Sequence, residues 1–196
     1  MSGIDLSPKL VWKFKYDFTD DYVKNLLEGV VFDKVPLENG DAGSSVNRKE
    51  DQPHLRDCNI EFLQWMTNKA ISVFKEWEYP TKLPFYIQSS WNNIHSNGGE
   101  TLEHNHALCN MVVSCYIKCP SNSGSIMFRD PIHDYRCMEP VSVGSNPWRE
   151  VQVETGDVLF FPGWLYHKTQ VSRTSSARIV STYNIKSKLE LIDKTR

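Results

Sequence analysis

Two histidines lie one residue apart in the segment EHNHALCN, in a chain that has six histidines among 196 residues. On a β-strand, residues i and i+2 point to the same face, so His104 and His106 are expected to point together. A third histidine, His167, follows the apolar run GDVLFFPGWLY, and a barrel would bring it close to the pair. Imidazole is the commonest protein ligand of transition metals. The pattern therefore predicts a three-histidine metal site with open coordination positions.

An H-x-H pair by itself is equally compatible with an exposed strand, because so short a pattern often arises by chance. The G-D-x-x-x-x-P element that precedes His167 favours the metal site. His95 is expected to line the same cavity, whereas His54 and His133 are expected to be solvated.

Arg178 is the next candidate functional residue, because it is a charged residue near the start of the apolar strand pattern ARIVSTYN. A guanidinium inside a barrel is well shaped to bind a carboxylate through two hydrogen bonds. The alternative is an edge-strand arginine that points to water.

The N-terminal part of the chain is predicted to be helical. Thr19 followed by Asp20 and Asp21 is typical of a helix start, and this helix is expected to end at Gly29. Apolar residues at spacings of three and four predict a second helix over residues 59–77, closed by Pro80 and Pro84. Residues 39–57 are polar and rich in glycine, which predicts a mobile loop or lid.

From residue 85 onward the pattern changes to short runs of β-branched and aromatic residues separated by Gly, Pro, Asn and Ser. Residues 96–99 are expected to form a turn. Seven strands with no helix between them exclude a parallel βαβ sheet and favour a sandwich or barrel. The predicted strands are residues 85–95, 111–118, 125–128, 149–154, 157–161, 166–171 and 177–185.

The predicted fold class is therefore mainly β, a jelly roll with N-terminal helices packed on its core. One domain is expected over residues 1–196, with a helical layer at 1–84 and the β core at 85–186.

Composition limits the classes of partner. Twenty-two basic and 24 acidic residues give a net charge of −2, and no Lys/Arg run indicates nucleic-acid binding. No apolar stretch approaches the roughly 20 residues of a spanning helix, and residues 1–10 lack a secretory pattern. Five cysteines without a C-x-x-C pair argue against disulfides and thiolate zinc sites. A cytoplasmic protein is expected.

An ordered set of residues in the second half of the chain, which includes the histidines and Arg178, resembles the iron(II)- and 2-oxoglutarate-dependent oxygenases. More narrowly, the set looks like a group of small members from marine bacteria and phages that carry the H-x-H motif. The resemblance spans residues 85–185, and VWKFKYDF is similar to that group's first strand. It rests on Trp91, Asn93, Gly98, His104, His106, Tyr116, Gly124, Asp130-Pro131, Gly156-Asp157, Phe161-Pro162, His167 and Arg178 to Asn184.

The resemblance implies a double-stranded β-helix with iron(II) as cofactor and 2-oxoglutarate as co-substrate. It implies that His104 and His167 are the first and last histidine ligands and that Arg178 binds the distal carboxylate of 2-oxoglutarate. Asn93 and Tyr116 are weaker candidates for hydrogen bonds to the co-substrate. The implied reaction consumes oxygen, releases succinate and carbon dioxide, and hydroxylates an unknown prime substrate.

The chain departs from the superfamily pattern at His106, where an Asp or Glu is usual. Three interpretations stay open: His106 binds iron directly, Asp130 supplies a carboxylate from elsewhere, or His106 only lines the cavity. An all-histidine site would leave the metal centre more positive. We prefer direct binding by His106, because its position and direction fit.

Two other functions compete with the oxygenase. One is a cupin-type three-histidine dioxygenase without 2-oxoglutarate, and the other is a non-catalytic jelly-roll binding protein. Only the oxygenase gives Arg178 a required role, so that residue discriminates between them. A homodimer through apolar barrel edges is also compatible with the sequence.

Overall fold

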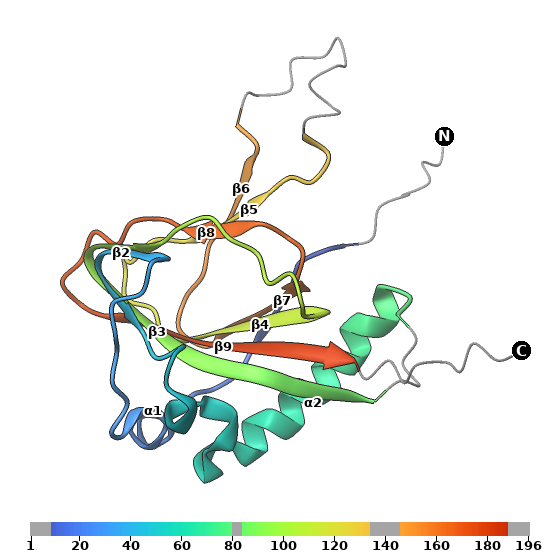
Figure 1. Ribbon diagram of the computed structural model, residues 1–196, viewed down its shortest axis with the longest axis horizontal. Coiled ribbons are helices and arrows are strands. Elements are labelled where there is room, and N and C mark those ends of the chain that lie inside the picture. Colours follow the sequence, from blue (N-terminus) through green and yellow to red (C-terminus); the bar gives the residue numbers. More distant parts are fainter. Residues whose placement is uncertain (1–8, 80–83, 134–145, 188–196) are drawn as a thin grey trace, which may run out of the picture.

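The computed structural model describes residues 9–79, 84–133 and 146–187. It contains two antiparallel sheets that enclose the interior of a jelly roll, which confirms the predicted fold class (Figure 1). The larger sheet has six strands in the order β1-β7-β4-β9-β3-β2, and the smaller has three in the order β6-β5-β8. The strands are β1 Trp12–Lys15, β2 Glu38–Ser44, β3 Phe85–Thr101, β4 Met111–Lys118, β5 Ile126–Arg129, β6 Trp148–Val151, β7 Asp157–Pro162, β8 His167–Thr169 and β9 Arg178–Ser187.

Two helices cover the outer face of the larger sheet, α1 Asp20–Leu27 and α2 Ile60–Glu76 (Figure 1). Both were predicted, and the Thr19 side chain caps α1 by accepting a hydrogen bond from the backbone N of Tyr22. Pro80, which was expected to close α2, lies outside the described residues. No helix in the described ranges is long and apolar enough to span a membrane.

Alternation along the central strands separates two cores. On β4, Met111, Val113 and Cys115 pack against α2, whereas Val112 and Tyr116 point between the two sheets. Because both faces of β4 are covered, this strand is apolar on both sides, as central strands are. The inter-sheet core therefore lines the interior in which the site lies.

The segment 39–57 contradicts the prediction of a mobile loop. Its first part is the edge strand β2, which pairs with β3, and three short 3-10 turns follow at Lys49–Asp51, Pro53–Leu55 and Asp57–Asn59. An edge strand needs only backbone hydrogen bonds on one side, so a polar sequence can form it. The predicted helical layer at 1–84 is thus also wrong in part, since it contains β1 and β2.

The expected turn at residues 96–99 is a bend inside a longer strand. Asn97 and Gly98 have positive φ angles of 30° and 85°, yet β3 continues to Thr101 beside β2. A Cβ atom at Gly40 would overlap the Gly98 carbonyl, so the close approach of the two strands at the bend requires glycine. The bend therefore directs the chain after β3 across the mouth of the barrel.

Candidate metal centre and co-substrate pocket

The three predicted histidines come together at the mouth of the barrel. Their ring centroids are separated by 4.3 Å for His104 and His167, 5.1 Å for His104 and His106, and 5.2 Å for His106 and His167. One ring nitrogen from each lies within 4.8 Å of those of the other two, close enough to share one metal ion.

The reason for their convergence differs from the one predicted. His104 and His106 lie in the segment after β3 and not on a strand. His104 forms an isolated bridge with His167 through reciprocal backbone hydrogen bonds of 3.0 and 2.9 Å, and the His106 N–H donates to the Gly163 carbonyl at 2.8 Å. A Cβ at Gly163 would overlap the Cys109 and His106 backbone, so the glycine permits this contact. Backbone hydrogen bonds to His167 and Gly163 therefore fix the directions of the His104 and His106 side chains.

All three imidazoles present the same nitrogen to the cavity. The Nδ1 atoms of His104 and His167 lie 2.8 and 2.9 Å from the carbonyl oxygens of Leu102 and Leu165. Nδ1 of His106 lies 2.6 Å from Oδ1 of Asn184. Because carbonyl oxygens only accept, each Nδ1 donates its proton and each Nε2 keeps a free lone pair. Nε2 of His106 is buried and has no hydrogen-bond partner in the described part of the chain, so its lone pair is available to a metal ion.

Burial keeps these imidazoles neutral. It lowers the pKa of His106 to about 4 and the pKa of His167 well below the ordinary value, and the neighbouring histidines add to both shifts. The pKa of His104 is also lowered, again chiefly by burial. Metal binding requires neutral imidazole, so the three side chains are in the correct protonation state at pH 7.

Asn184 holds His106 in place, a role that the sequence pattern did not reveal. Its Nδ2 donates to Ser89 Oγ at 3.2 Å, which directs Oδ1 toward His106, and Trp91 stacks on the His106 ring at 5.6 Å. Alternation along β9 could have indicated this position, because Arg178 and Asn184 are separated by an even number of residues and face the interior together.

The Asn184→Ala variant is expected to bind iron(II) about 10- to 100-fold more weakly, because partners that orient metal-binding histidines usually contribute that much. Anaerobic iron titration would measure the loss. Ser89→Ala is the matched control and should have a smaller effect, since it removes only the hydrogen bond that orients the amide. Equal affinity in Asn184→Ala and wild type would contradict the positioning role.

Arg178 is fully buried, as predicted for a residue inside the barrel. Its Nη1 donates to the backbone carbonyls of Ser123 and Gly124 at 2.6 and 3.0 Å. Nε and Nη2 have no partner in the described residues. Burial lowers the pKa of Arg178, yet a guanidinium stays charged in proteins. A buried cation with two free donors has the chemistry to bind an anion.

A cavity of about 510 Å³ extends from the three histidines into the barrel. Asn93 and Tyr116 line it, as expected, and so does His95. Oδ1 of Asn93 accepts a hydrogen bond from Ser44 Oγ at 2.7 Å, and burial raises the pKa of Tyr116 above its ordinary value. The volume lies within the range that is usual for small-molecule sites.

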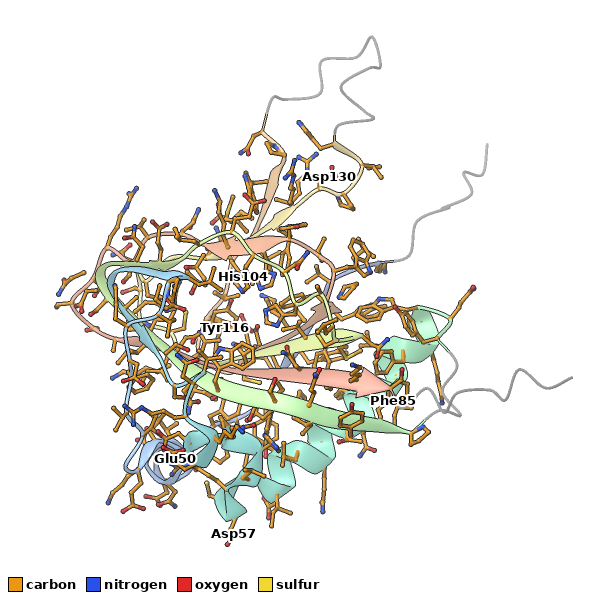
Figure 2. All side chains as sticks on the ribbon, viewed as in Figure 1. Glu50, Asp57, Phe85, His104, Tyr116 and Asp130 are labelled. Carbon is orange, nitrogen blue, oxygen red and sulfur yellow. The ribbon has the colours of Figure 1, made fainter. Side chains whose placement is uncertain are left out.

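Asp130 is not part of the histidine group. Its carboxylate lies 3.3 Å from Arg149 Nη2 and accepts from the Ile132 N–H at 3.1 Å. Figure 2 shows it just past the outer end of β5, apart from His104. The other two histidines differ from the prediction that they are solvated: His133 is buried, and His54 is half-buried with Nδ1 2.7 Å from Ser90 Oγ.

Comparison with known proteins shows the family to which the chain belongs. Residues 89–184, about half of the chain, match the family model of the 2OG-Fe(II) oxygenases. The chain belongs to the iron(II)- and 2-oxoglutarate-dependent oxygenase superfamily. It is accordingly an oxygenase that uses iron(II) as cofactor and 2-oxoglutarate as co-substrate. No curated protein matches the sequence.

Solved structures share the fold of this oxygenase. The carbocyclase SnoK from nogalamycin biosynthesis has a TM-score of 0.63 at 13% identity, covering 91% of this chain and 79% of its own. HygX from Streptomyces hygroscopicus, solved with nickel and 2-oxoglutarate, has a TM-score of 0.58 at 13% identity, covering 93% and 84%. A Pseudomonas putida prolyl-4-hydroxylase has a TM-score of 0.56 at 12% identity, covering 90% and 91%.

Proposed function

We propose that His104, His106 and His167 hold the iron(II) of this oxygenase and that Arg178 binds the distal carboxylate of 2-oxoglutarate. The observation that carries the proposal is the set of free, buried donor atoms. One ring nitrogen from each of the three histidines converges at the cavity, Nε2 of His106 is buried, and Nε and Nη2 of Arg178 are buried as well. None of these three buried nitrogens has a hydrogen-bond partner in the described residues. Buried polar atoms are rarely left without partners, so these atoms indicate ligands.

The iron supplies the activation of oxygen when it is bound, and the chain supplies position and protection from water. Leu102, Leu165 and Asn184 fix the imidazole tautomers through Nδ1. Arg178 fixes the far end of the co-substrate, which would place its keto acid end toward the histidines. Asn93 and Tyr116 line the space between and are proposed as further polar contacts.

His106 is the ligand that replaces the usual carboxylate in this proposal. Its free Nε2 lies with those of the other two histidines, whereas the Asp130 carboxylate is engaged by Arg149. An all-histidine face is chemically reasonable, because the carboxylate at the keto acid end of the co-substrate can supply one of the negative charges that the three neutral imidazoles lack. We therefore favour direct binding by His106 over a carboxylate supplied by Asp130.

We propose hydroxylation of a C–H bond as the reaction and an apolar group as the part of the prime substrate that enters. Leu37, Val46 and Leu108 line the cavity although they are 42%, 46% and 74% exposed. Exposed apolar side chains gathered at a cavity mouth are typical of binding sites.

A cytoplasmic location stays part of this proposal and is supported by the four described cysteines, which are all free. A homodimer also stays a prediction. The cupin-type and non-catalytic alternatives lose ground because neither explains a buried, unpartnered guanidinium.

Anaerobic iron(II) titration of the wild-type protein, with and without 2-oxoglutarate, tests the proposal. We expect binding of one iron(II) per chain, a visible charge-transfer band when 2-oxoglutarate is added, and succinate once oxygen is admitted. Iron binding without a band in the presence of 2-oxoglutarate would favour the cupin-type function. Failure to bind iron would favour the non-catalytic one.

A further inference from the structure

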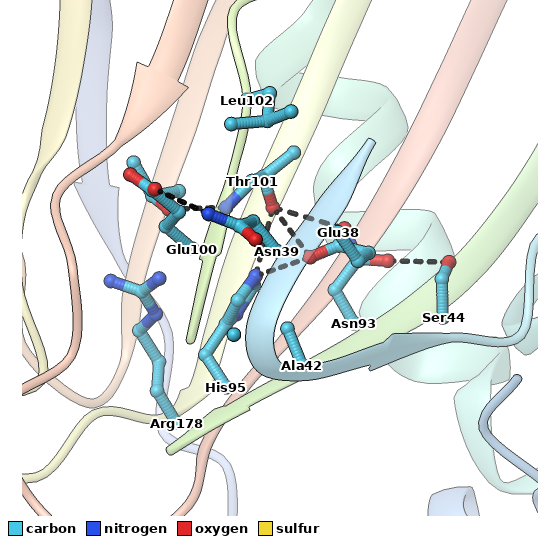
Figure 3. A network of polar contacts seen from close by, with 12 residues as sticks. Glu38, Asn39, Ala42, Ser44, Asn93, His95, Glu100, Thr101, Leu102 and Arg178 are labelled. Carbon is cyan, nitrogen blue, oxygen red and sulfur yellow. Dashed lines mark hydrogen bonds and ion pairs between the residues drawn. The ribbon is translucent and has the colours of Figure 1, made fainter. Parts of the chain in front are cut away.

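A buried carboxylate–histidine pair lines the cavity, with His95 next to Arg178 (Figure 3). Nε2 of His95 is 2.8 Å from Oε2 of Glu38, and the Thr101 hydroxyl donates to Oε1 of Glu38 at 3.0 Å. His95 is 1% and Glu38 5% exposed. Neither the iron site nor its supporting hydrogen bonds, as described above, uses this pair. A buried anion in a co-substrate cavity therefore needs an explanation.

His95 and Arg178 stand opposite each other on neighbouring strands. They are register partners in the β3–β9 ladder, so their side chains lie on the same face of the sheet. Nδ1 of His95, like Nε and Nη2 of Arg178, is buried and without a hydrogen-bond partner in the described residues. Three unsatisfied nitrogens on two adjacent side chains are suited to bind one carboxylate group.

We propose that His95 is a second binding residue for the distal carboxylate of 2-oxoglutarate and takes up a proton from solvent when that carboxylate binds. In the bound state the imidazolium donates from Nε2 to Glu38 and from Nδ1 to the co-substrate. The inference rests on the proposed role of Arg178. It adds His95 to the residues that bind the co-substrate and gives Glu38 its function as the counter-ion.

The balance of charge supports proton uptake. The charged or titratable groups around His95 are Glu38 on β2, Glu100 on β3 and Arg178 on β9, with Tyr116 on β4 near Arg178. Without ligand, the anionic Glu38 and the cationic Arg178 balance each other. A bound carboxylate adds a negative charge to this buried group, and a proton on His95 restores the balance.

The protonation state of His95 before ligand binding allows this proton uptake. Burial, together with the charge of Arg178, lowers the pKa of His95, and the hydrogen bond to Glu38 opposes the shift only in part. His95 is therefore neutral at pH 7 before binding. An added anion raises the pKa of His95, so binding takes up a proton and the affinity for 2-oxoglutarate increases as the pH falls from the pKa of the bound state toward that of the free state.

The test compares two ligands on iron(II)-loaded protein under anaerobic conditions: 2-oxoglutarate, and 2-oxopentanoate, which has the same chain length without the distal carboxylate. His95→Gln keeps a donor toward Glu38 and loses Nδ1. We expect it to bind 2-oxoglutarate about 10- to 100-fold more weakly, the usual size of a hydrogen bond to a charged group, and 2-oxopentanoate as wild type does. His95→Asn, which keeps a donor near Nδ1, should recover part of the loss.

Calorimetry at pH 7 in two buffers of different ionisation enthalpy measures proton uptake. We expect close to one proton per 2-oxoglutarate in wild type, none for 2-oxopentanoate, and none in His95→Gln. If His95→Gln does not fold, Glu38→Gln provides the same test. It removes the counter-ion, so 2-oxoglutarate should still bind but without a proton.

Equal losses for both ligands, or unchanged affinity for 2-oxoglutarate in His95→Gln, would overturn the inference and leave the proposed function intact. Absence of proton uptake in wild type would overturn it as well. Failure of wild type to form the charge-transfer band would instead count against the proposed function, and the inference would fall with it.

Discussion

The His106→Ala variant is expected to lose iron(II) affinity by at least about 100-fold and, with it, turnover of 2-oxoglutarate. Loss of the residues that merely orient metal ligands already costs 10- to 100-fold, and removal of a ligand should cost more. The fold should persist, because His106 lies outside the strands and its backbone hydrogen bond to Gly163 does not need the side chain. Anaerobic iron titration and succinate formation are the measurements.

Asp130→Asn is the matched control for this variant, since Asp130 is the competing candidate for the site. We expect it to bind iron(II) and form the charge-transfer band as wild type does, because its carboxylate contacts Arg149 and is not grouped with the histidines. The reverse result, with the band kept in His106→Ala and lost in Asp130→Asn, would assign the third ligand to the carboxylate.

The Arg178→Met variant is expected to bind 2-oxoglutarate at least about 100-fold more weakly, because loss of one partner from a buried charged pair costs several kcal/mol. The same variant should be no less stable than wild type without ligand. The buried guanidinium has two unpartnered nitrogens, and methionine fills similar space without a charge to desolvate. Arg178 therefore lowers the stability of the unliganded fold and raises the affinity for 2-oxoglutarate.

Three measurements separate these effects: the dissociation constant of 2-oxoglutarate, that of 2-oxopentanoate, and the free energy of unfolding in urea. We expect only the dissociation constant of 2-oxoglutarate to increase in Arg178→Met. If both ligands bind more weakly and the free energy of unfolding also falls, Arg178 serves the packing of the barrel through Ser123 and Gly124 and not the co-substrate.

Local patterns predicted most elements of this fold. The strand and helix periods, the Thr19 cap and the breaks at glycine and proline depend on neighbours in the sequence, so a single chain displays them. The edge strand β2 was missed because its stability comes from β3, fifty or so residues away, and not from its own polar residues. Glu38 was missed for the same reason: only the β2–β3 pairing places it against His95.

The candidate site was likewise predicted in part from the sequence. The H-x-H pair, the late histidine and the arginine at the start of an apolar strand were visible as residue types, and the structure brings the three histidines together as the sequence predicted. The predicted reason for this arrangement was wrong. Backbone hydrogen bonds to His167 and Gly163, and not strand alternation, fix the directions of the His104 and His106 side chains. Asn184 and Ser89, which orient His106, were not recognised.

The sequence by itself determined which side chains are available for chemistry, the alternation of the central strands and hence the class of fold. Only the tertiary structure decided which nitrogen of each histidine is free, which acid lines the cavity and which polar atoms are buried without partners. The physical reason is that tautomers, burial and unsatisfied hydrogen bonds are properties of contacts between distant segments. Composition and spacing record the groups, while folding alone sets their surroundings.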